Sequence, residues 1–171
     1  MDRPSATREL FQGRWLQVVE ETWPGVGAWE IVRPADAAAV LARTPDGDVL
    51  LVRQFRPAAG RALLEIPAGL LDMDGESPVA CATRELVEET GFRHISIEPL
   101  AVVFPSPGAW GERIHLFEAE TTSEPDGDPE DGIELVRLPF DEVVAEARAG
   151  RMEDAKTALA LLLSASRGVG G

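Results

Sequence analysis

Three glutamates crowd one short segment of the chain. Residues 81–92 read CATRELVEETGF, in which Glu85, Glu88 and Glu89 follow directly after Arg84. If the segment is helical these residues share one face, where like charges three or four positions apart repel each other. A cation over the cluster would remove that repulsion. Oxygen ligands of this kind suit Mg²⁺, which takes one or two carboxylates together with water and phosphate oxygens.

The flanking residues predict that this segment is a helix. Ser77 can cap its start, Pro78 suits the first helical position, and Gly91 suits the position just past the end. At about 100° per residue, the glutamates lie beside an apolar stripe rather than opposite to it. We expect the buried stripe to consist of Val79, Ala82, Thr83, Leu86 and Thr90. A charged face that only contacts water would lie opposite the core, so this arrangement favours a metal site.

The composition excludes several classes of protein. The chain has 30 acidic and 16 basic residues and a formal net charge of −14, which disfavours binding to nucleic acid. An anionic substrate would need metal ions or an arginine cluster to reverse this field locally. The single cysteine, Cys81, cannot form an intramolecular disulfide, and no apolar run approaches a membrane span. We expect a cytoplasmic protein without a membrane or nucleic-acid partner. Zinc is disfavoured because His94 and His115 are far apart in the sequence.

A longer segment extends the glutamate pattern. Residues 68–92, AGLLDMDGESPVACATRELVEETGF, resemble the Nudix box. That motif consists of glycine, five residues, glutamate, seven residues, arginine-glutamate, an apolar residue, any residue, two glutamates, any residue, glycine and an apolar residue. One spacing differs, because six residues separate Gly69 from Glu76. The extra residue lies in the loop before the helix, where we expect it to bulge without moving the helical glutamates.

The resemblance implies metal-binding roles within the box. Nudix enzymes hold divalent metal ions on a loop–helix–loop and cleave a nucleoside diphosphate linked to another moiety. By motif position, Glu85 and Glu89 would be the main Mg²⁺ ligands and the catalytic carboxylates. Glu88 would contribute directly or through water, and the backbone carbonyl of Ala68 would be a further ligand. Mn²⁺ could replace Mg²⁺.

Four other residues of the box have structural roles by the same resemblance. Glu76 would pair with Arg84 and so orient the helix rather than touch substrate. Gly69 and Gly91 would serve as the fixed glycines near the two ends of the motif.

Segments around the box resemble one branch of the family, the ADP-ribose pyrophosphatases. They are VRQFRPA before the box, LEIPAG leading into it and FPSPGAWGERIHLFEAE after it. Pro105 and Pro107 lie beyond the box, where this branch has a discriminating proline. The resemblance implies hydrolysis of ADP-ribose to AMP and ribose 5-phosphate by a metal-activated water. It also implies a homodimer in which the N-terminal strands help to build the partner's site.

The same segments supply candidate substrate-binding residues. Arg56 matches the second arginine of the branch's RQxRP stretch and would grip a phosphate with two hydrogen bonds. Glu112 matches the glutamate that follows SPG and would face the site. Trp110 and Gly111 depart from the branch, which has small polar and acidic residues at these positions.

Two further positions leave alternatives open. Trp29, like Trp15, lies in an expected strand, where it could stack on adenine or pack in a dimer interface. Relatives take a catalytic acid from the loop before the strand at residues 133–138, which places Glu130 or Asp131 there. The alternative for this loop is a mobile, solvated acidic turn.

The order of the expected elements indicates one α+β domain over residues 1–171, a Nudix fold with a mixed β-sheet between helices. We expect antiparallel strands of the dimer interface in residues 1–35, the core in 36–165 and a flexible tail in 166–171. The first dozen residues have no pattern and read as a lead-in. The expected strands are 14–22, 28–34, 37–43, 48–57, 62–69, 94–104, 112–120 and 133–138, and the expected helices are 78–90, 140–150 and 153–164.

Three other interpretations compete with an ADP-ribose pyrophosphatase. The first is a Nudix hydrolase for another nucleotide sugar, such as GDP-mannose, or for a dinucleotide. The second is a Nudix module that senses a nucleotide without cleaving it, which the three glutamates disfavour because a sensor needs no metal carboxylates. The third, an acidic interaction scaffold, leaves the box pattern unexplained.

Overall fold

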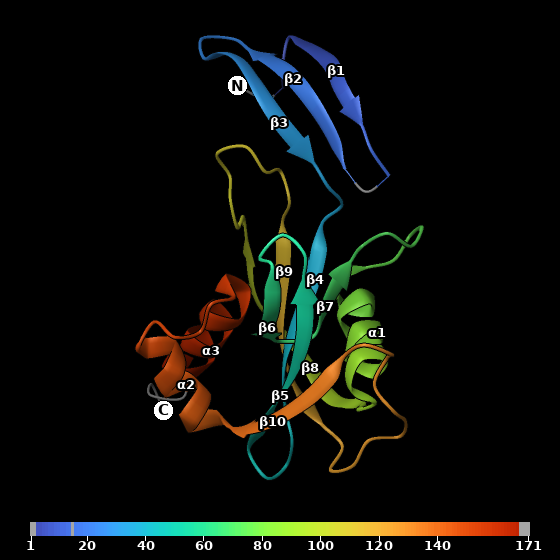
Figure 1. Cartoon of the computed structure of the whole chain (residues 1–171), viewed down its shortest axis with the longest axis vertical. Coiled ribbons are helices and arrows are strands. Elements are labelled where there is room, and N and C mark those ends of the chain that lie inside the picture. Colours follow the sequence, from blue (N-terminus) through green and yellow to red (C-terminus); the bar gives the residue numbers. More distant parts are fainter. Residues whose placement is uncertain (1–2, 15, 168–171) are drawn as a thin grey trace.

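Two separate β-sheets and three helices make up the described part of the chain (Figure 1). The computed structural model describes residues 3–14 and 16–167. The elements are β1 (Ala6–Gln12), β2 (Gln17–Trp23), β3 (Gly27–Arg33), β4 (Ala37–Arg43), β5 (Asp48–Arg56), β6 (Arg61–Glu65), β7 (Ala68–Leu70), α1 (Pro78–Thr90), β8 (His94–Val103), β9 (Ile114–Thr121), β10 (Glu134–Pro139), α2 (Phe140–Arg148) and α3 (Ala155–Arg167).

The N-terminal strands β1, β2 and β3 form an antiparallel sheet that projects from the rest of the molecule (Figure 1). β2 and β3 form the predicted hairpin. The prediction of an unpatterned lead-in is wrong, because Ala6–Gln12 pairs with β2. Every residue of β1 is exposed, so no apolar alternation marks this strand in the sequence. Trp15 lies outside the described residues.

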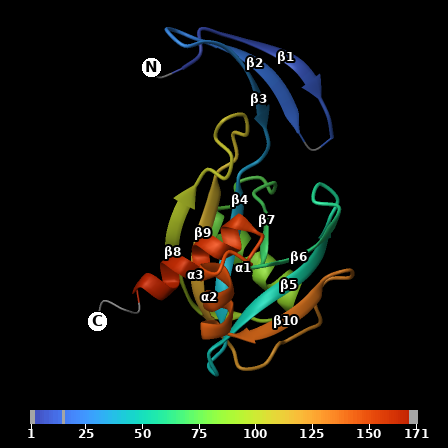
Figure 2. The same ribbon diagram turned by 60° about the vertical axis from the view of Figure 1, so that its left-hand side comes forward.

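The larger sheet has the strand order β10-β5-β4-β9-β8, and β6 and β7 pair with β5 and β4 respectively. β4 and β9 run parallel, and the other pairs are antiparallel, so the sheet is mixed. The helix α1 covers one face, while α2 and α3 cover the other (Figures 1 and 2). This arrangement confirms the predicted α+β fold with a mixed sheet between helices and antiparallel strands at the N-terminus.

The central strand β4 lies between the two helical layers. Its first six residues, AAAVLA, are all buried. Because side chains alternate along a strand, Ala39 and Leu41 face the layer of α2 and α3, whereas Ala38 and Val40 face α1. The short alanine side chains let α1 pack closely against the sheet, which fixes the helix beside the loop that precedes it.

The helix ends agree largely with the predictions. α1 starts after Ser77, whose hydroxyl accepts a hydrogen bond of 3.3 Å from the Ala80 amide, and ends at Gly91 with φ of 75°. α3 continues to Arg167, beyond the predicted end at residue 164 and into the predicted tail. Residues 168–171 of that tail lie outside the described residues. Over residues 3–14 and 16–167, every helix is too short or too polar to cross a lipid bilayer.

Candidate active site

The helix α1 turns two of its glutamates towards the protein interior. Its buried residues are Cys81, Ala82, Glu85, Leu86, Glu89 and Thr90. The buried face of α1 therefore differs from the predicted one, because Val79 is exposed and Thr83 is only half-buried. Glu85 and Glu89 lie within the buried face and not beside it. Buried carboxylates are costly unless they are paired or bind a metal ion, so their placement indicates a site.

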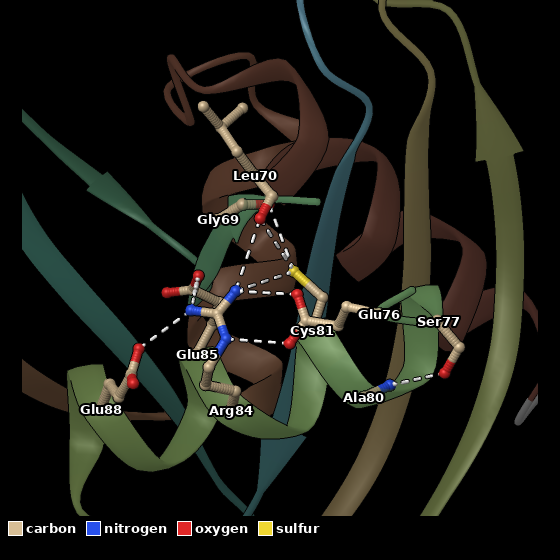
Figure 3. Close-up of polar contacts among 9 residues, drawn as sticks. All are labelled: Gly69, Leu70, Glu76, Ser77, Ala80, Cys81, Arg84, Glu85 and Glu88. Carbon is tan, nitrogen blue, oxygen red and sulfur yellow. Dashed lines mark hydrogen bonds and ion pairs between the residues drawn. The ribbon is translucent and has the colours of Figure 1, made fainter. Parts of the chain in front are cut away.

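Arg84 gathers three carboxylates around its guanidinium group (Figure 3). Its Nε and Nη2 donate to the two oxygens of Glu76 at 2.9 and 3.1 Å, which is the predicted ion pair. Its Nη1 donates to Glu85 at 2.6 Å and to Glu88 at 3.0 Å. Nη2 also lies 3.4 Å from the carbonyl of Leu70, the last residue of β7. Arg84 thus ties the box loop to α1 and partly offsets the repulsion among the acids.

Glu89 is held differently from its neighbours. Its Oε2 accepts a hydrogen bond of 3.0 Å from the backbone amide of Ala68. Burial is the largest influence and raises the pKa of Glu89 to about 7, against the opposing effect of this hydrogen bond. The nearby charge of Glu85 raises it further, whereas the charges of Arg56 and Lys156 lower it.

The strand β7, which leads into the loop before α1, approaches the glutamates closely. A β-carbon on Gly69 would collide with the carboxylate of Glu85, so only glycine leaves room for that side chain. The extra residue of the box is absorbed in a turn, where the Glu76 amide donates to the Met73 carbonyl at 3.1 Å. Gly75 has φ of 75° in this turn. Glu76 still reaches Arg84 across this longer loop.

The donor set suits a hard divalent cation. The carboxylates of Glu85 and Glu89 are both buried, and burial raises the pKa of each, although the charge of Arg84 opposes this at Glu85. A bound cation would offset that cost with oxygen ligands alone, as Mg²⁺ prefers. Within the described part of the chain, no three acidic, histidine or cysteine side chains converge closely enough to hold an ion. Arg84 pairs with two of the three helical glutamates, Glu85 and Glu88.

The acidic loop between β9 and β10 is fastened to the end of α1. The Asp126 amide donates to the Gly91 carbonyl and the Glu130 amide donates to the Glu88 carbonyl, both at 2.8 Å. A side chain at Gly91 would collide with the carbonyl of Gly127, so this docking requires glycine there. The charge of Glu130 contributes to the raised pKa of Glu85. The side chain of Glu130 therefore lies close enough to the glutamate cluster for its charge to act on Glu85.

A cavity of about 450 Å³ lies beside the box loop. Arg56 and Glu112, both predicted to bind substrate, line it together with Ala68 and Gly69. Glu112 accepts a hydrogen bond of 3.0 Å from the indole of Trp110, and burial raises its pKa. The cavity therefore joins residues predicted from separate segments of the sequence.

Three charged residues that line this cavity were not predicted. They are Glu65, Asp154 and Lys156. Glu65 binds the Arg56 guanidinium with two hydrogen bonds of 2.7 and 2.9 Å. Burial acts to raise the pKa of Glu65, but Arg56 and Lys156 outweigh it and lower the pKa. The sequence contained a signal that could have drawn attention to Lys156, because it is the only lysine of the chain.

Trp29 lines a second cavity, of about 560 Å³, between the N-terminal sheet and the loop after β8. Trp23, Phe104 and Trp110 contribute to the same wall, so the surface is strongly aromatic. The indole of Trp23 and the guanidinium of Arg33 both donate to Glu21, at 3.0 and 2.5 Å. This places Trp29 in a concave aromatic surface of the kind that stacks on a planar ring.

Comparison with known proteins identifies the family. A model of the NUDIX domain matches residues 33–161, which include α1 and its glutamates. The chain belongs to the Nudix family. Membership confirms the predicted family and the prediction of a Nudix pyrophosphohydrolase.

Relatives of this Nudix protein carry several different names. It is 32% identical to an ADP-ribose pyrophosphatase of Bacillus subtilis, with 94% of this chain and 90% of the relative covered. It is 38% identical to a GDP-mannose pyrophosphatase of Yersinia enterocolitica, with 90% of each chain covered. It is 36% identical to a methanol dehydrogenase activator of Bacillus methanolicus, with 91% and 88% covered. These relatives confirm the predicted branch and leave the individual substrate open.

Proposed function

We propose that this Nudix hydrolase cleaves the diphosphate of ADP-ribose to AMP and ribose 5-phosphate with Mg²⁺, for which Mn²⁺ can substitute. The observation that carries the proposal is the buried pair Glu85 and Glu89 next to a cavity lined by Arg56. In this arrangement carboxylates bind cations on one side, and a guanidinium binds phosphate on the other. The single cysteine and the small anionic substrate fit a cytoplasmic enzyme.

Each residue of the site has a role in this proposal. A bound divalent cation would supply an activated water and neutralise charge on the diphosphate. Glu85 and Glu89, with the Ala68 carbonyl, would hold it, and Glu88 would act directly or through water. Arg56 would orient a phosphate with the N–H groups that Glu65 leaves free.

Glu130 is our choice for the general base. The hydrogen bond from its amide to the Glu88 carbonyl fixes it at the end of the metal-binding helix. A base needs to lie within hydrogen-bond reach of the attacking water, directly or through another water. Glu130 and Asp131, the alternative from the sequence, are both exposed, but Asp131 lacks such a tether among the contacts of the described residues.

The aromatic cavity supports an adenine nucleotide. One loop, the segment between β8 and β9, lines both cavities, with Phe104 in the aromatic one and Pro105 in the one beside the box. A substrate can therefore extend along this loop from its base to its diphosphate. Guanine would need acceptors for its N1–H and its exocyclic amino group, whereas the nearby carboxylate of Glu21 is buried and accepts from Trp23 and Arg33. GDP-mannose remains the second candidate because of the relatives with that name.

A substrate panel tests this proposal. The purified protein is incubated with Mg²⁺ and ADP-ribose, GDP-mannose, UDP-glucose, a diadenosine polyphosphate or 8-oxo-dGTP, and the products are separated by chromatography. We expect AMP and ribose 5-phosphate from ADP-ribose, and no product from the Glu89→Gln variant. Faster turnover of GDP-mannose would replace the substrate and keep the mechanism. Nucleotide binding without any turnover would instead support a sensor.

The N-terminal sheet supports a homodimer as part of this proposal. It projects from the core, and its Phe11 and Trp29 are 56% and 52% exposed. Large apolar side chains on a protruding sheet favour burial against a second copy. We expect a dimer in sedimentation experiments that Phe11→Glu weakens. Phe55→Glu is the matched control, since Phe55 is 61% exposed but belongs to β5 of the core sheet. A monomeric parent protein would exclude the dimer.

A further inference from the structure

The first turn of α3 brings the only lysine of the chain to the cavity beside the box loop, where we propose that the diphosphate binds. The side chain of Lys156 is only 11% exposed. Its ammonium group contacts the carboxylate of Glu65 and lies 3.0 Å from Oδ1 of Asp154. An ammonium that gives up water in this way needs a compensating gain, which these two carboxylates supply.

Glu65 joins this lysine to Arg56. The Glu65 side chain is 2% exposed, and its Oε2 accepts from both Lys156 and Arg56. The guanidinium of Arg56 uses its Nε and Nη2 for Glu65, which leaves further N–H groups of its five available. Glu65 therefore fixes the orientation of Arg56, but on its own it would also cancel the charge of Arg56.

The charges around the cavity show what Lys156 changes. Arg56 and Lys156 balance Glu65 and Asp154, so the group of four is neutral as a whole. Without Lys156 the same group would carry one net negative charge, close to the acidic cluster of α1. A negative group at this position repels a diphosphate, whereas a neutral one leaves Arg56 free to attract it.

The start of α3 is held in place independently of the lysine. The Ile66 amide donates to the Thr157 hydroxyl at 2.8 Å, and that hydroxyl donates to Asp154 at 2.5 Å. The Thr157 amide also donates to Asp154 at 3.0 Å, which caps the helix. Removal of the Lys156 charge therefore leaves α3 attached to the strand that leads into the box.

We propose that Lys156 is a positioning residue for the anionic substrate: its charge offsets one of the two negative charges of Glu65 and Asp154, so that the group of four is neutral and Arg56 can offer its free N–H groups to a phosphate oxygen. This role rests on the proposed function, because it requires a diphosphate in the cavity. Substrate binding would then depend on a network of ion pairs that joins β5, β6 and the start of α3.

The test compares Lys156→Met, Asp154→Asn and the double variant in steady-state kinetics with ADP-ribose and Mg²⁺. We expect Lys156→Met to raise KM on the order of 10-fold and to change kcat much less. Asp154→Asn removes one negative charge while asparagine still caps the helix, so it should lower KM. In the double variant the charge balance is restored, and KM should return towards that of the parent protein.

A structural role would give a different pattern. Both single variants would then lose thermal stability and kcat, and the double variant would be at least as impaired as either, which would overturn the proposal. Calorimetric titration of the same proteins with inorganic diphosphate and Mg²⁺ provides a readout without turnover. If the parent binds diphosphate but hydrolyses no nucleotide sugar, the proposed function fails, and the order of diphosphate affinities still decides the role of Lys156. If the parent neither binds diphosphate nor hydrolyses a nucleotide sugar, both proposals fail.

Discussion

The carboxylate of Glu85 occupies the space that a β-carbon on Gly69 would fill. The two residues belong to β7 and to α1, so this contact sets how closely the strand approaches the acidic cluster. Gly69 does not have a positive φ, and alanine is therefore compatible with its backbone. The glycine is required by the carboxylate above it and not by the chain conformation.

We predict that Gly69→Ala reduces kcat on the order of 100-fold, because Glu85 must move by about an ångström or more. The melting temperature should change only slightly, since the displaced group is the end of a flexible side chain. Gly47→Ala is the control: Gly47 has φ of 89° with open space around it, so alanine there strains the backbone without touching the site. Full activity of Gly69→Ala would show that the position of Glu85 is unimportant.

Glu89 should destabilise the metal-free protein at neutral and higher pH. Its pKa of about 7 in the folded state lies above the ordinary value of 4.5, so the folded state binds more protons between these values. Stability from this group is therefore lost as pH rises from 4.5 through 7. Glu89→Gln should stabilise the metal-free protein at pH 8 by on the order of 3 kcal/mol and by much less near pH 5.

Urea unfolding of both proteins with a chelator present, at pH 5 and pH 8, measures this difference. The same variant should be inactive at either pH. A variant that is equally or less stable than the parent at pH 8 would mean that Glu89 carries no burial cost.

Metal binding should oppose the loss of folding stability that ionised Glu89 causes at higher pH. A divalent cation binds ionised Glu89, so binding releases protons and strengthens as pH rises through 7. We expect Mg²⁺ to raise the melting temperature more at pH 8 than at pH 6, and EDTA to reverse the increase. Calorimetric titrations in two buffers of different ionisation enthalpy would count the released protons. Glu89→Gln should lose both the pH dependence and the proton release.

Glu130→Gln should lower kcat on the order of 100-fold or more, as expected for loss of a general base. Asp131→Asn is the matched control on the neighbouring residue and should retain near-normal kcat. The backbone hydrogen bond from Glu130 to Glu88 does not involve the side chain, so the loop should stay docked in both variants. The reverse order of effects would assign the base to Asp131.

The ends of α1 and the glutamates on it could be predicted from the sequence, because local chemistry determines them. Ser77 caps the helix and Gly91 ends it through their own backbone and side-chain properties. The Glu76–Arg84 ion pair follows from the fixed spacing of the motif. The strand β1 was missed for the converse reason, since a fully exposed strand has no apolar alternation to reveal it.

Only the tertiary structure decided how the site is completed. The contact between Glu65 and Lys156 joins residues that are 91 positions apart, and no local pattern encodes such a pair. The docking of Glu130 on the end of α1 likewise depends on how the chain returns from β9 to β10. The sequence by itself determined which carboxylates lie together on the helix, because helical periodicity is a local property. Packing determined which cations face them, because that depends on which distant segments the sheet brings together.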